Sequence, residues 1–284
     1  MVARLRTFSL AALAFIAGSA ANAADYSQPL PPPPPPIYVQ PPPQFAEGWY
    51  LRGQVGVGMT GGAGAEFIEN PAHTTGFKFE NTSYSDAYFI GGGVGYEFNN
   101  WLRFDATAEY RAKSRIHAFG SYTSGGGTFG DIYEGNLKSW LFLANAYVDL
   151  GTWNCFTPFV GAGIGAAYNT LADFVDTSAA TPTGGFGRGF GRNPSEWHLA
   201  WALYAGVAYD VSKNFKVELA YRYLNYGSIT DTVDCVGGCI PDSFKFGNLY
   251  SHDFMLGLRW TCCELPAPVV YAPPPPPPLL RSRG

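Results

Sequence analysis

The sequence predicts an all-β protein, an eight-stranded antiparallel transmembrane β-barrel with proline-rich extensions at both ends. Three observations predict this fold. Segments of about ten residues alternate strictly between apolar and polar side chains, the connections between them are short and long in turn, and proline is concentrated outside them. Beyond the amino-terminal leader, no stretch approaches the ~20 consecutive apolar residues of a membrane helix. Any insertion into a membrane must therefore use strands.

Eight segments show the two-residue period that is typical of a β-strand. Between residues 102 and 111, for example, apolar side chains occupy the even positions and polar or charged ones the odd positions. A helix with this alternation would carry apolar groups all round its circumference, which argues against a helical alternative. The predicted strands are residues 49–60, 88–98, 101–111, 139–150, 156–168, 197–210, 215–224 and 251–260.

The polar faces of these strands carry charges of nearly balanced sign. The basic residues are Arg52, Arg103, Arg111, Lys216, Arg222 and Arg259, and the acidic residues are Glu97, Asp105, Glu109, Asp149, Asp210, Glu218 and Asp253. On the apolar faces, His252 is the one ionisable side chain. Burying an unpaired charge costs several kcal/mol, whereas a hydrogen-bonded network of charges is tolerated. The balance predicts a filled lumen in which these groups pair, with glycines 91, 93, 95, 161, 163 and 165 leaving room for them.

The connections separate a soluble barrel from a membrane barrel. Residues 99–100, 151–155 and 212–214 are short connections, while residues 61–87, 112–138, 169–196 and 225–250 are long ones. Outer-membrane barrels have short periplasmic turns and long external loops, whereas a secreted soluble barrel has no reason to lengthen every loop at one end. The apolar faces are therefore expected to meet lipid. Two interfacial aromatic girdles are expected from Trp49, Phe98, Trp101, Trp140, Tyr168, Trp197, Phe215 and Trp260.

Residues 1–23 have the pattern of a secretory signal peptide. Arg4 and Arg6 precede an apolar stretch, and Ala21-Asn22-Ala23 is a small-x-small cleavage site. An anchor helix is the alternative, but the apolar stretch is too short to span a bilayer. Cleavage after Ala23 removes two arginines and takes the net charge from −4 to −6. This charge gives no basic footprint for nucleic acid.

Proline divides the remaining chain into an arm, a domain and a tail. Ten of the 23 prolines lie between Pro29 and Pro43, and eight lie between Pro266 and Pro278. Such runs cannot form a β-ladder and adopt extended polyproline II. We expect a periplasmic arm at residues 24–45, the barrel at 46–260 and a periplasmic tail at 261–284.

Several motifs resemble one known family. They are WYLRGQVGVG in the first strand, NAYVDLG at 145–151, TPFVGAGIGAAY at 157–168, VELAYRYL at 217–224 and HDFMLGLRW in the last strand. In order and spacing they are similar to the small eight-stranded outer-membrane β-barrels of α-proteobacteria, the porin-family surface antigens related in architecture to the OmpA barrel. The resemblance implies that Trp260, with Leu256 and Leu258, is the signal read by the barrel-assembly machinery. In the family this aromatic usually ends the chain, whereas 24 residues follow Trp260 here.

The same resemblance implies a link to peptidoglycan. Some family members are joined to it through a mature amino terminus that begins Ala-Asp, and Ala24-Asp25 matches that start. An arm of ~25 residues in polyproline II would reach roughly 75 Å, enough to leave the bilayer and meet the cell wall. The alternative is that Ala24-Asp25 is an ordinary post-cleavage pair and that the proline run is a disordered spacer.

Five cysteines permit disulfides in an exported chain and leave one thiol unpaired. Cys235 and Cys239 flank a flexible Val-Gly-Gly, where a local disulfide is sterically easy. A second candidate bridge joins Cys155 to Cys262 or Cys263 at the periplasmic end. Metal binding is the less favoured alternative, because the cysteines divide between opposite ends of the barrel.

The histidines, a Ser-His-Asp tripeptide and a glycine-rich segment could suggest a chemical site, but each is better explained by a structural role. The histidines at 73, 117, 198 and 252 are scattered, and we expect surface or girdle positions rather than ligation of haem or a metal. Consecutive strand residues point to opposite faces, so Ser251-His252-Asp253 cannot form a catalytic triad. The segment 184–192 lacks the Gly-Lys-Ser/Thr of a phosphate-binding loop and is an external loop whose Arg188 and Arg192 are candidates for lipopolysaccharide contact. We expect no catalytic residue, cofactor or metal.

The expected function is structural. A barrel of this kind would contribute to envelope integrity and cell-surface properties, with the arm as its link to peptidoglycan. Two alternatives stay open: a narrow porin-like diffusion channel, and an adhesin or ligand-binding protein that acts through its loops. The expected partners are outer-membrane lipid, lipopolysaccharide, peptidoglycan and the barrel-assembly machinery, without nucleic acid. Enzymatic activity is not expected.

Overall fold

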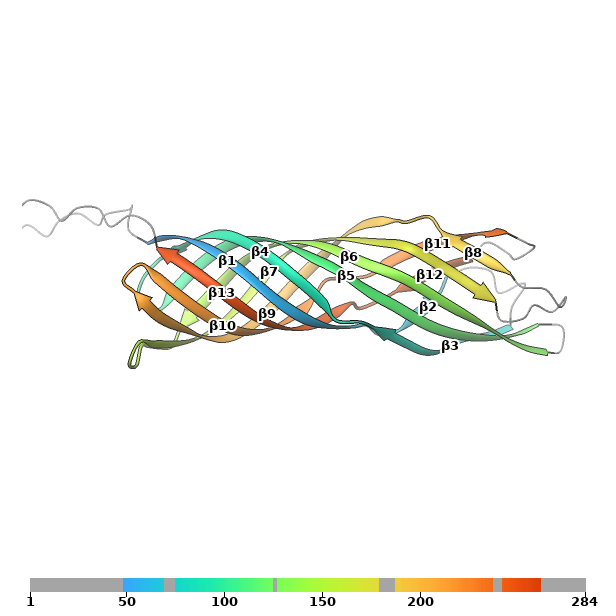
Figure 1. Ribbon diagram of the computed structural model, residues 1–284, viewed down its shortest axis with the longest axis horizontal. Helices are drawn as coiled ribbons and strands as arrows, with labels where there is room; N and C mark the ends of the chain where they lie inside the picture. The colour runs from blue at the N-terminus through green and yellow to red at the C-terminus, as the bar shows by residue number, and fades with distance from the viewer. Residues whose placement is uncertain (1–47, 69–74, 125–126, 179–186, 237–241, 262–284) are drawn as a thin grey trace, which may run out of the picture. The chain divides into compact units, whose positions relative to one another are not determined.

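The computed structural model describes residues 48–68, 75–124, 127–178, 187–236 and 242–261. They form an antiparallel sheet (Figure 1). Its strands are β1 (Trp49–Gly61), β2 (Ala65–Phe67), β3 (Thr75–Tyr84), β4 (Ala87–Glu97), β5 (Leu102–Ser124), β6 (Gly127–Asp149), β7 (Phe156–Ser178), β8 (Arg188–Gly191), β9 (Ser195–Ser212), β10 (Phe215–Asn225), β11 (Ile229–Val236), β12 (Asp242–Phe246) and β13 (Tyr250–Thr261). The described ranges contain no helix of the length and apolarity needed to cross a membrane. Both proline-rich ends lie outside them.

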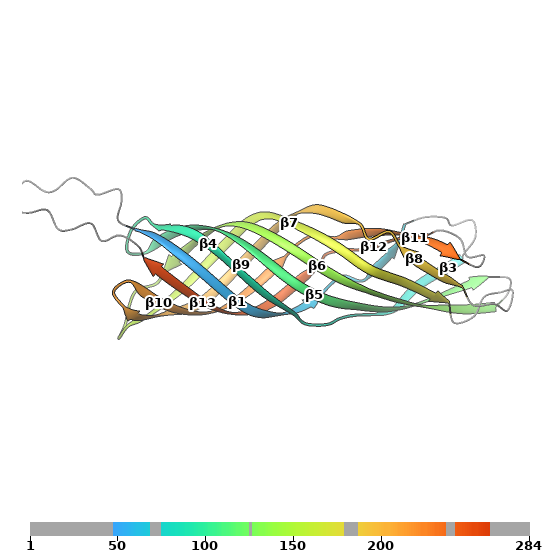
Figure 2. The same cartoon turned by 45° about the horizontal axis from the view of Figure 1, so that its top comes forward.

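Eight of these strands close into a hydrogen-bonded ring. The order around it is β1, β4, β5, β6, β7, β9, β10, β13 and back to β1. Starting from Tyr110 on β5, the cross-strand partners can be followed around the ring in either direction until they reach β9. One direction ends at Trp197 and the other at Val207, so one full circuit shifts the strand register by ten residues. Such a shift tilts the strands, and Figures 1 and 2 show them winding obliquely around the barrel.

The predicted strand positions are confirmed at the short-turn end of the barrel. β1, β4, β10 and β13 agree with the prediction within one residue at both ends. The prediction of long loops is wrong at the other end: β5, β6 and β7 each run for 23 residues. Together with β2, β3, β8, β11 and β12, their outer halves form what we call the extension. Its strand order is β3, β5, β6, β7, β8, β11, β12 and β2.

The inner face changes from polar to apolar where the barrel meets the extension. On β5 the odd residues up to Arg111 point inward, and above it Ser114, Ile116 and Ala118 do so. The register shifts between Arg111 and Ser114, which marks a β-bulge. A bulge adds one residue and exchanges the two faces of a strand. The even, apolar positions of β5 therefore meet lipid below the bulge and form a core above it.

The extension has its own aromatic core. The rings of Tyr133 and Phe244 have centroids 4.9 Å apart, and those of Phe67 and Phe77 are 5.0 Å apart. Phe174, Phe244 and Phe246 are buried. The Phe67–Phe77 contact joins β2 to β3, which end the strand order of the extension and do not pair by backbone hydrogen bonds in the described residues. The extension is therefore held by ring packing as well as by its ladders.

The outer face of the barrel proper is an apolar belt bounded by aromatic residues. From Leu102 to Tyr110 the apolar face of β5 covers nine residues. At ~3.3 Å per residue and a tilt of ~40° these span roughly 23 Å, close to the ~25 Å band of an outer-membrane barrel. Of the predicted girdle residues, Tyr168 and Phe215 are half-buried, and the exposed ones are Trp49, Phe98, Trp101, Trp140, Trp197 and Trp260.

Candidate functional site

The lumen holds two clusters of buried charges. The cluster nearer the extension contains Arg111, Arg222, Glu109 and Asp253. Asp253 accepts hydrogen bonds from Arg111 Nη1 at 2.8 Å, Arg111 Nη2 at 2.9 Å and Arg222 Nε at 2.8 Å. Glu109 accepts one from Arg222 Nη2 at 2.7 Å. Two positive and two negative groups therefore neutralise each other inside the bore.

The second cluster surrounds Glu218, towards the short turns. Its carboxylate lies 3.3 Å from Arg259 Nε, 3.6 Å from Arg52 Nη2 and 3.6 Å from Arg103 Nη2. Asp105 pairs with Arg52 at 3.0 Å on the neighbouring side. β5 and β10 are four places apart in either direction around the ring, so the Arg103–Glu218 contact crosses the whole bore. The lumen is therefore occupied at this level.

Aromatic rings complete the packing of the second cluster around Glu218, which we call the lower cluster. The guanidinium carbon of Arg103 lies 4.1 Å from the ring centre of Tyr147 and 4.7 Å from that of Phe159. The Tyr147 hydroxyl accepts a hydrogen bond from Arg52 Nη1 at 2.7 Å. Such stacking favours a desolvated guanidinium. Sequence reasoning missed these rings as part of the network, although their position on the charged parity of the strands could have identified them.

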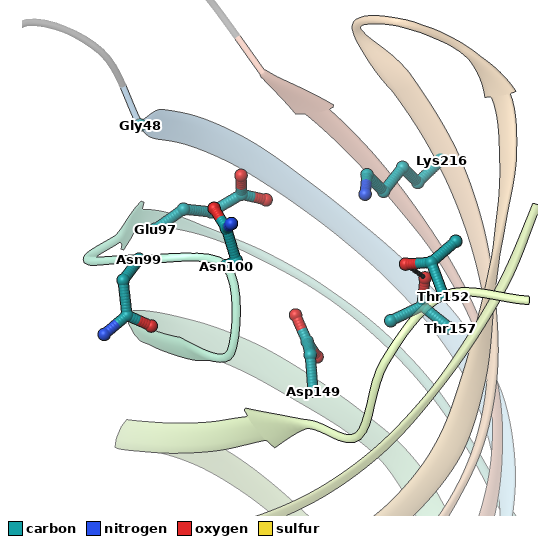
Figure 3. Close-up of a pocket in the computed structure, with 8 residues that line it drawn as sticks. All are labelled: Gly48, Glu97, Asn99, Asn100, Asp149, Thr152, Thr157 and Lys216. Carbon is teal, nitrogen blue, oxygen red and sulfur yellow. Dashed lines mark hydrogen bonds between the residues drawn. The ribbon is translucent and has the colours of Figure 1, made fainter.

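The lumen opens at the short-turn end into a polar pocket of about 310 Å³ (Figure 3). Its lining includes Glu97, Asp149 and Lys216. Each of these charges already has a partner inside the barrel: Glu97 pairs with Arg259 at 3.3 Å, Asp149 with Arg103 at 3.1 Å and Lys216 with Asp210 at 3.0 Å. The pocket is a vestibule of paired charges rather than an arrangement of a nucleophile and a base.

The other predicted site residues lie apart from this network. Leu256, Leu258 and Trp260 are exposed on the outer face of β13. Ala24 and Asp25, the proposed peptidoglycan attachment, lie outside the described residues. Cys155 is exposed in the turn before β7 and is a free thiol among the described residues, while Cys262 and Cys263, its predicted partners, lie outside them. The pairing of Cys235, Cys239, Cys262 and Cys263 falls on side chains that are not described.

The histidines and loop arginines also have separate places. His252 points outward, and its Nδ1 atom lies 2.6 Å from the Tyr221 hydroxyl oxygen. Its neighbours Ser251 and Asp253 are buried in the lumen. Arg192 is exposed and pairs with Asp234 at 2.5 Å. Arg188 lies on β8 with its guanidinium carbon 5.3 Å from the ring centre of Phe190. A lipopolysaccharide contact at Arg188 and Arg192 stays a prediction.

Comparison with known proteins identifies the family. Residues 8–261 match the model of the outer membrane protein beta-barrel domain. The chain belongs to this family. Its place is the cell outer membrane, which confirms the predicted localisation and the resemblance noted in the sequence.

Relatives of this outer-membrane barrel occur in several bacteria. An uncharacterized protein of Brucella abortus is 36% identical over 230 residues, covering 72% of this chain and 76% of that protein. A putative adhesin of Rickettsia conorii is 29% identical over 218 residues, with 75% and 81% covered. Outer membrane protein PagN of Salmonella typhimurium is 28% identical over 182 residues, with 60% and 72% covered.

Solved structures are similar at lower identity. Neisserial surface protein A aligns with a TM-score of 0.44 at 15% identity, covering 75% of this chain and 97% of that one. The outer membrane protein OprG of Pseudomonas aeruginosa aligns with a TM-score of 0.45 at 13% identity, covering 76% and 97%.

Proposed function

We propose that this barrel is a cell-surface adhesion protein: the membrane part is a sealed anchor, and the extension is the part that contacts another surface. One observation carries the proposal. β5, β6 and β7 continue beyond the aromatic girdle as paired strands around a packed aromatic core. A binding surface on such a scaffold is pre-organised, so little chain entropy is lost when it binds a partner.

The filled lumen supports an anchor rather than a channel. Eight strands leave an interior just wide enough for side chains. Here both charged clusters reach across it, and Arg103, Arg222 and Arg259 are fully buried. The porin-like alternative would need these groups to move apart.

The outer face of the extension carries apolar side chains above the girdle. Phe119 on β5 and Ile132 on β6 are direct cross-strand partners and are 39% and 38% exposed. An apolar pair that faces water rather than lipid favours a role in contact with a partner. The relatives named as putative adhesins agree with this reading.

Attachment assays test the proposal. Escherichia coli cells that display the full chain should attach to cultured animal cells in larger numbers than cells without it, and the Phe119→Ser/Ile132→Ser variant should lose most of that gain. Val236→Ser, at an exposed apolar position on β11, is the matched control and should retain attachment. Equal attachment with and without the protein would refute the adhesion role.

A peptidoglycan tether is a second candidate function, which is compatible with the first. β1 begins at Trp49, at the short-turn end of the barrel, which is periplasmic in this class. The arm that precedes Trp49 would therefore start on the side of the cell wall. Mass spectrometry of lysozyme-digested cell walls tests it: a muropeptide on Ala24 supports the tether, and a wholly free amino terminus removes it.

A further inference from the structure

A basic cluster lies on the outer face of two neighbouring strands, just above the aromatic girdle. Lys113 and Arg115 on β5 are exposed, and Lys138 on β6 is half-buried on the outward parity of that strand. The bulge between Arg111 and Ser114 brings Lys113 opposite Lys138, because Arg111 pairs with Ser139 and Ser114 with Leu137. Cross-strand and diagonal neighbours lie within ~8 Å of each other. The three cations can therefore share one ligand.

The cluster has a defined height relative to the bilayer. Tyr110 and Trp140 are cross-strand partners immediately below it, with ring centroids 5.0 Å apart. Lys138 is two residues above Trp140 and Lys113 three above Tyr110, which places them roughly 5–8 Å beyond the girdle on strands tilted ~40°. This is the level of lipid headgroups, directly above the acyl chains that would meet Phe142 and the rest of the belt.

The three cations are not paired within the described part of the chain, although Asp86 and Glu134 lie near them. Like charges on facing strand positions repel. At corresponding outward positions the flanking strands carry Asp86 before β4, Thr170 on β7 and Ser195 on β9, so the basic character is confined to the β5–β6 sector. One layer higher, His117 faces Glu134 and the surface becomes mixed in charge.

We propose that Lys113, Arg115 and Lys138 form a binding site for the phosphate groups of a phosphorylated glycolipid of the outer leaflet, whose acyl chains lie against the Tyr110–Trp140 face. Guanidinium and ammonium groups are the usual partners of phosphate. Cations directly above a lipid-facing aromatic pair fit a ligand that is both anionic and acylated. The site differs from Arg188 and Arg192, which lie far from the girdle in the extension.

Native mass spectrometry of the purified full-length protein with added bisphosphorylated lipid A tests this site. The wild type should retain lipid A, and Lys113→Gln/Arg115→Gln/Lys138→Gln should weaken binding by roughly 30- to 100-fold. The control Lys78→Gln/Lys213→Gln/Lys245→Gln removes the same charge at other surface positions and should bind as the wild type does. Heat-modifiable migration in electrophoresis checks that each variant is folded.

Two further binding measurements identify the chemistry of the ligand. Lipid A without phosphates should bind no better to the wild type than to the cluster variant, and millimolar inorganic phosphate should leave most of the bound lipid A in place. Equal loss in the cluster and control variants would overturn the site. Undiminished binding of dephosphorylated lipid A, or complete displacement by inorganic phosphate, would overturn the assignment to a phosphorylated glycolipid.

Discussion

Arg222 and Glu109 lie on strands β10 and β5, which are four places apart in either direction around the ring, and yet Arg222 Nη2 is 2.7 Å from Glu109 Oε1. The pair therefore spans the full diameter of the bore. The same guanidinium also donates to Asp253 on the neighbouring strand β13. A contact that joins opposite walls acts as a cross-brace and as an obstruction.

Conductance depends on this brace. We expect the wild-type protein to show no discrete open-channel steps in a planar bilayer, because side chains fill its lumen. The charge-balanced variant Glu109→Ala/Arg222→Ala removes the obstruction and should show small, reproducible steps. The matched variant Asp210→Ala/Lys216→Ala removes a pair at the mouth and should stay closed. Steady wild-type steps would favour the channel.

Glu218 should be the most destabilising single charge to remove. It is buried and lies between three arginines, so Glu218→Gln removes the one counter-charge that all three share and leaves each with a single carboxylate partner. We expect the free energy of unfolding to fall by about 3–5 kcal/mol. Lys216→Gln breaks a partly exposed pair and should cost less than about 1 kcal/mol. Urea titration in lipid vesicles measures both, and equal losses would contradict the account of the lower cluster.

The lumen glycines make room for side chains on neighbouring strands. A Cβ atom at Gly161 would lie 2.4 Å from the Tyr147 ring and 2.8 Å from the carbonyl oxygen of Ala146. Gly161→Ala should therefore lower the free energy of unfolding by about 1–3 kcal/mol through overpacking. Gly53 on β1 has nothing within 4 Å of such an atom, and Gly53→Ala is the control. Urea titration in lipid vesicles measures both variants. If neither Gly161→Ala nor Gly53→Ala changes the free energy of unfolding, the packing role of Gly161 is refuted.

Acid should stabilise the extension. Burial raises the pKa of Asp231, on β11, from its ordinary 3.8 to about 6. The folded state then holds this proton more tightly than the unfolded state, so stability is greatest below about pH 4 and falls as the pH rises to 6. The loss above pH 6 is at most about 3 kcal/mol. Burial raises the pKa of Asp131 in the same direction.

Limited proteolysis of the extension at pH 5 and pH 7.5 measures this effect. Cleavage should be slower at pH 5 after correction for the protease's own activity on an unfolded substrate. Asp231→Asn removes the carboxyl group whose pKa is raised to about 6 and should reduce the difference in cleavage rate between pH 5 and pH 7.5. A wild-type extension that is cleaved equally fast at both values would contradict the buried position of this carboxylate.

The sequence predicts the membrane barrel because its signals are local. Alternation fixes which residues share a face, and the balanced charges on one face predict a filled lumen, as the contacts around Glu218 and Asp253 illustrate. It does not predict the extension, because a bulge at Ala112–Lys113 exchanges the faces of β5 without any change in the apolar-polar pattern. Bulges are set by pairing with a neighbouring strand, which a single strand does not encode.

Contacts between distant segments were also beyond the sequence. Phe67, Phe174 and Phe244 come from three different long connections, and their meeting in one core depends on the pairing of β12 with β2 and of β8 with β7 and β11. Short strands such as β8, with four residues, carry too few alternating positions to be recognised. Glycine-rich, polar composition made these segments look like loops.

The central claim is that the outward face of β5 meets lipid below the bulge and water above it, and lipid quenching tests it most directly. Phe104 and Phe119 both point outward on this strand, below and above the bulge. In a cysteine-free background, a bimane label at Phe104→Cys should be quenched by brominated phosphatidylcholine, and one at Phe119→Cys by aqueous iodide. Quenching of both labels by the brominated lipid would place the extension in the bilayer and contradict the account.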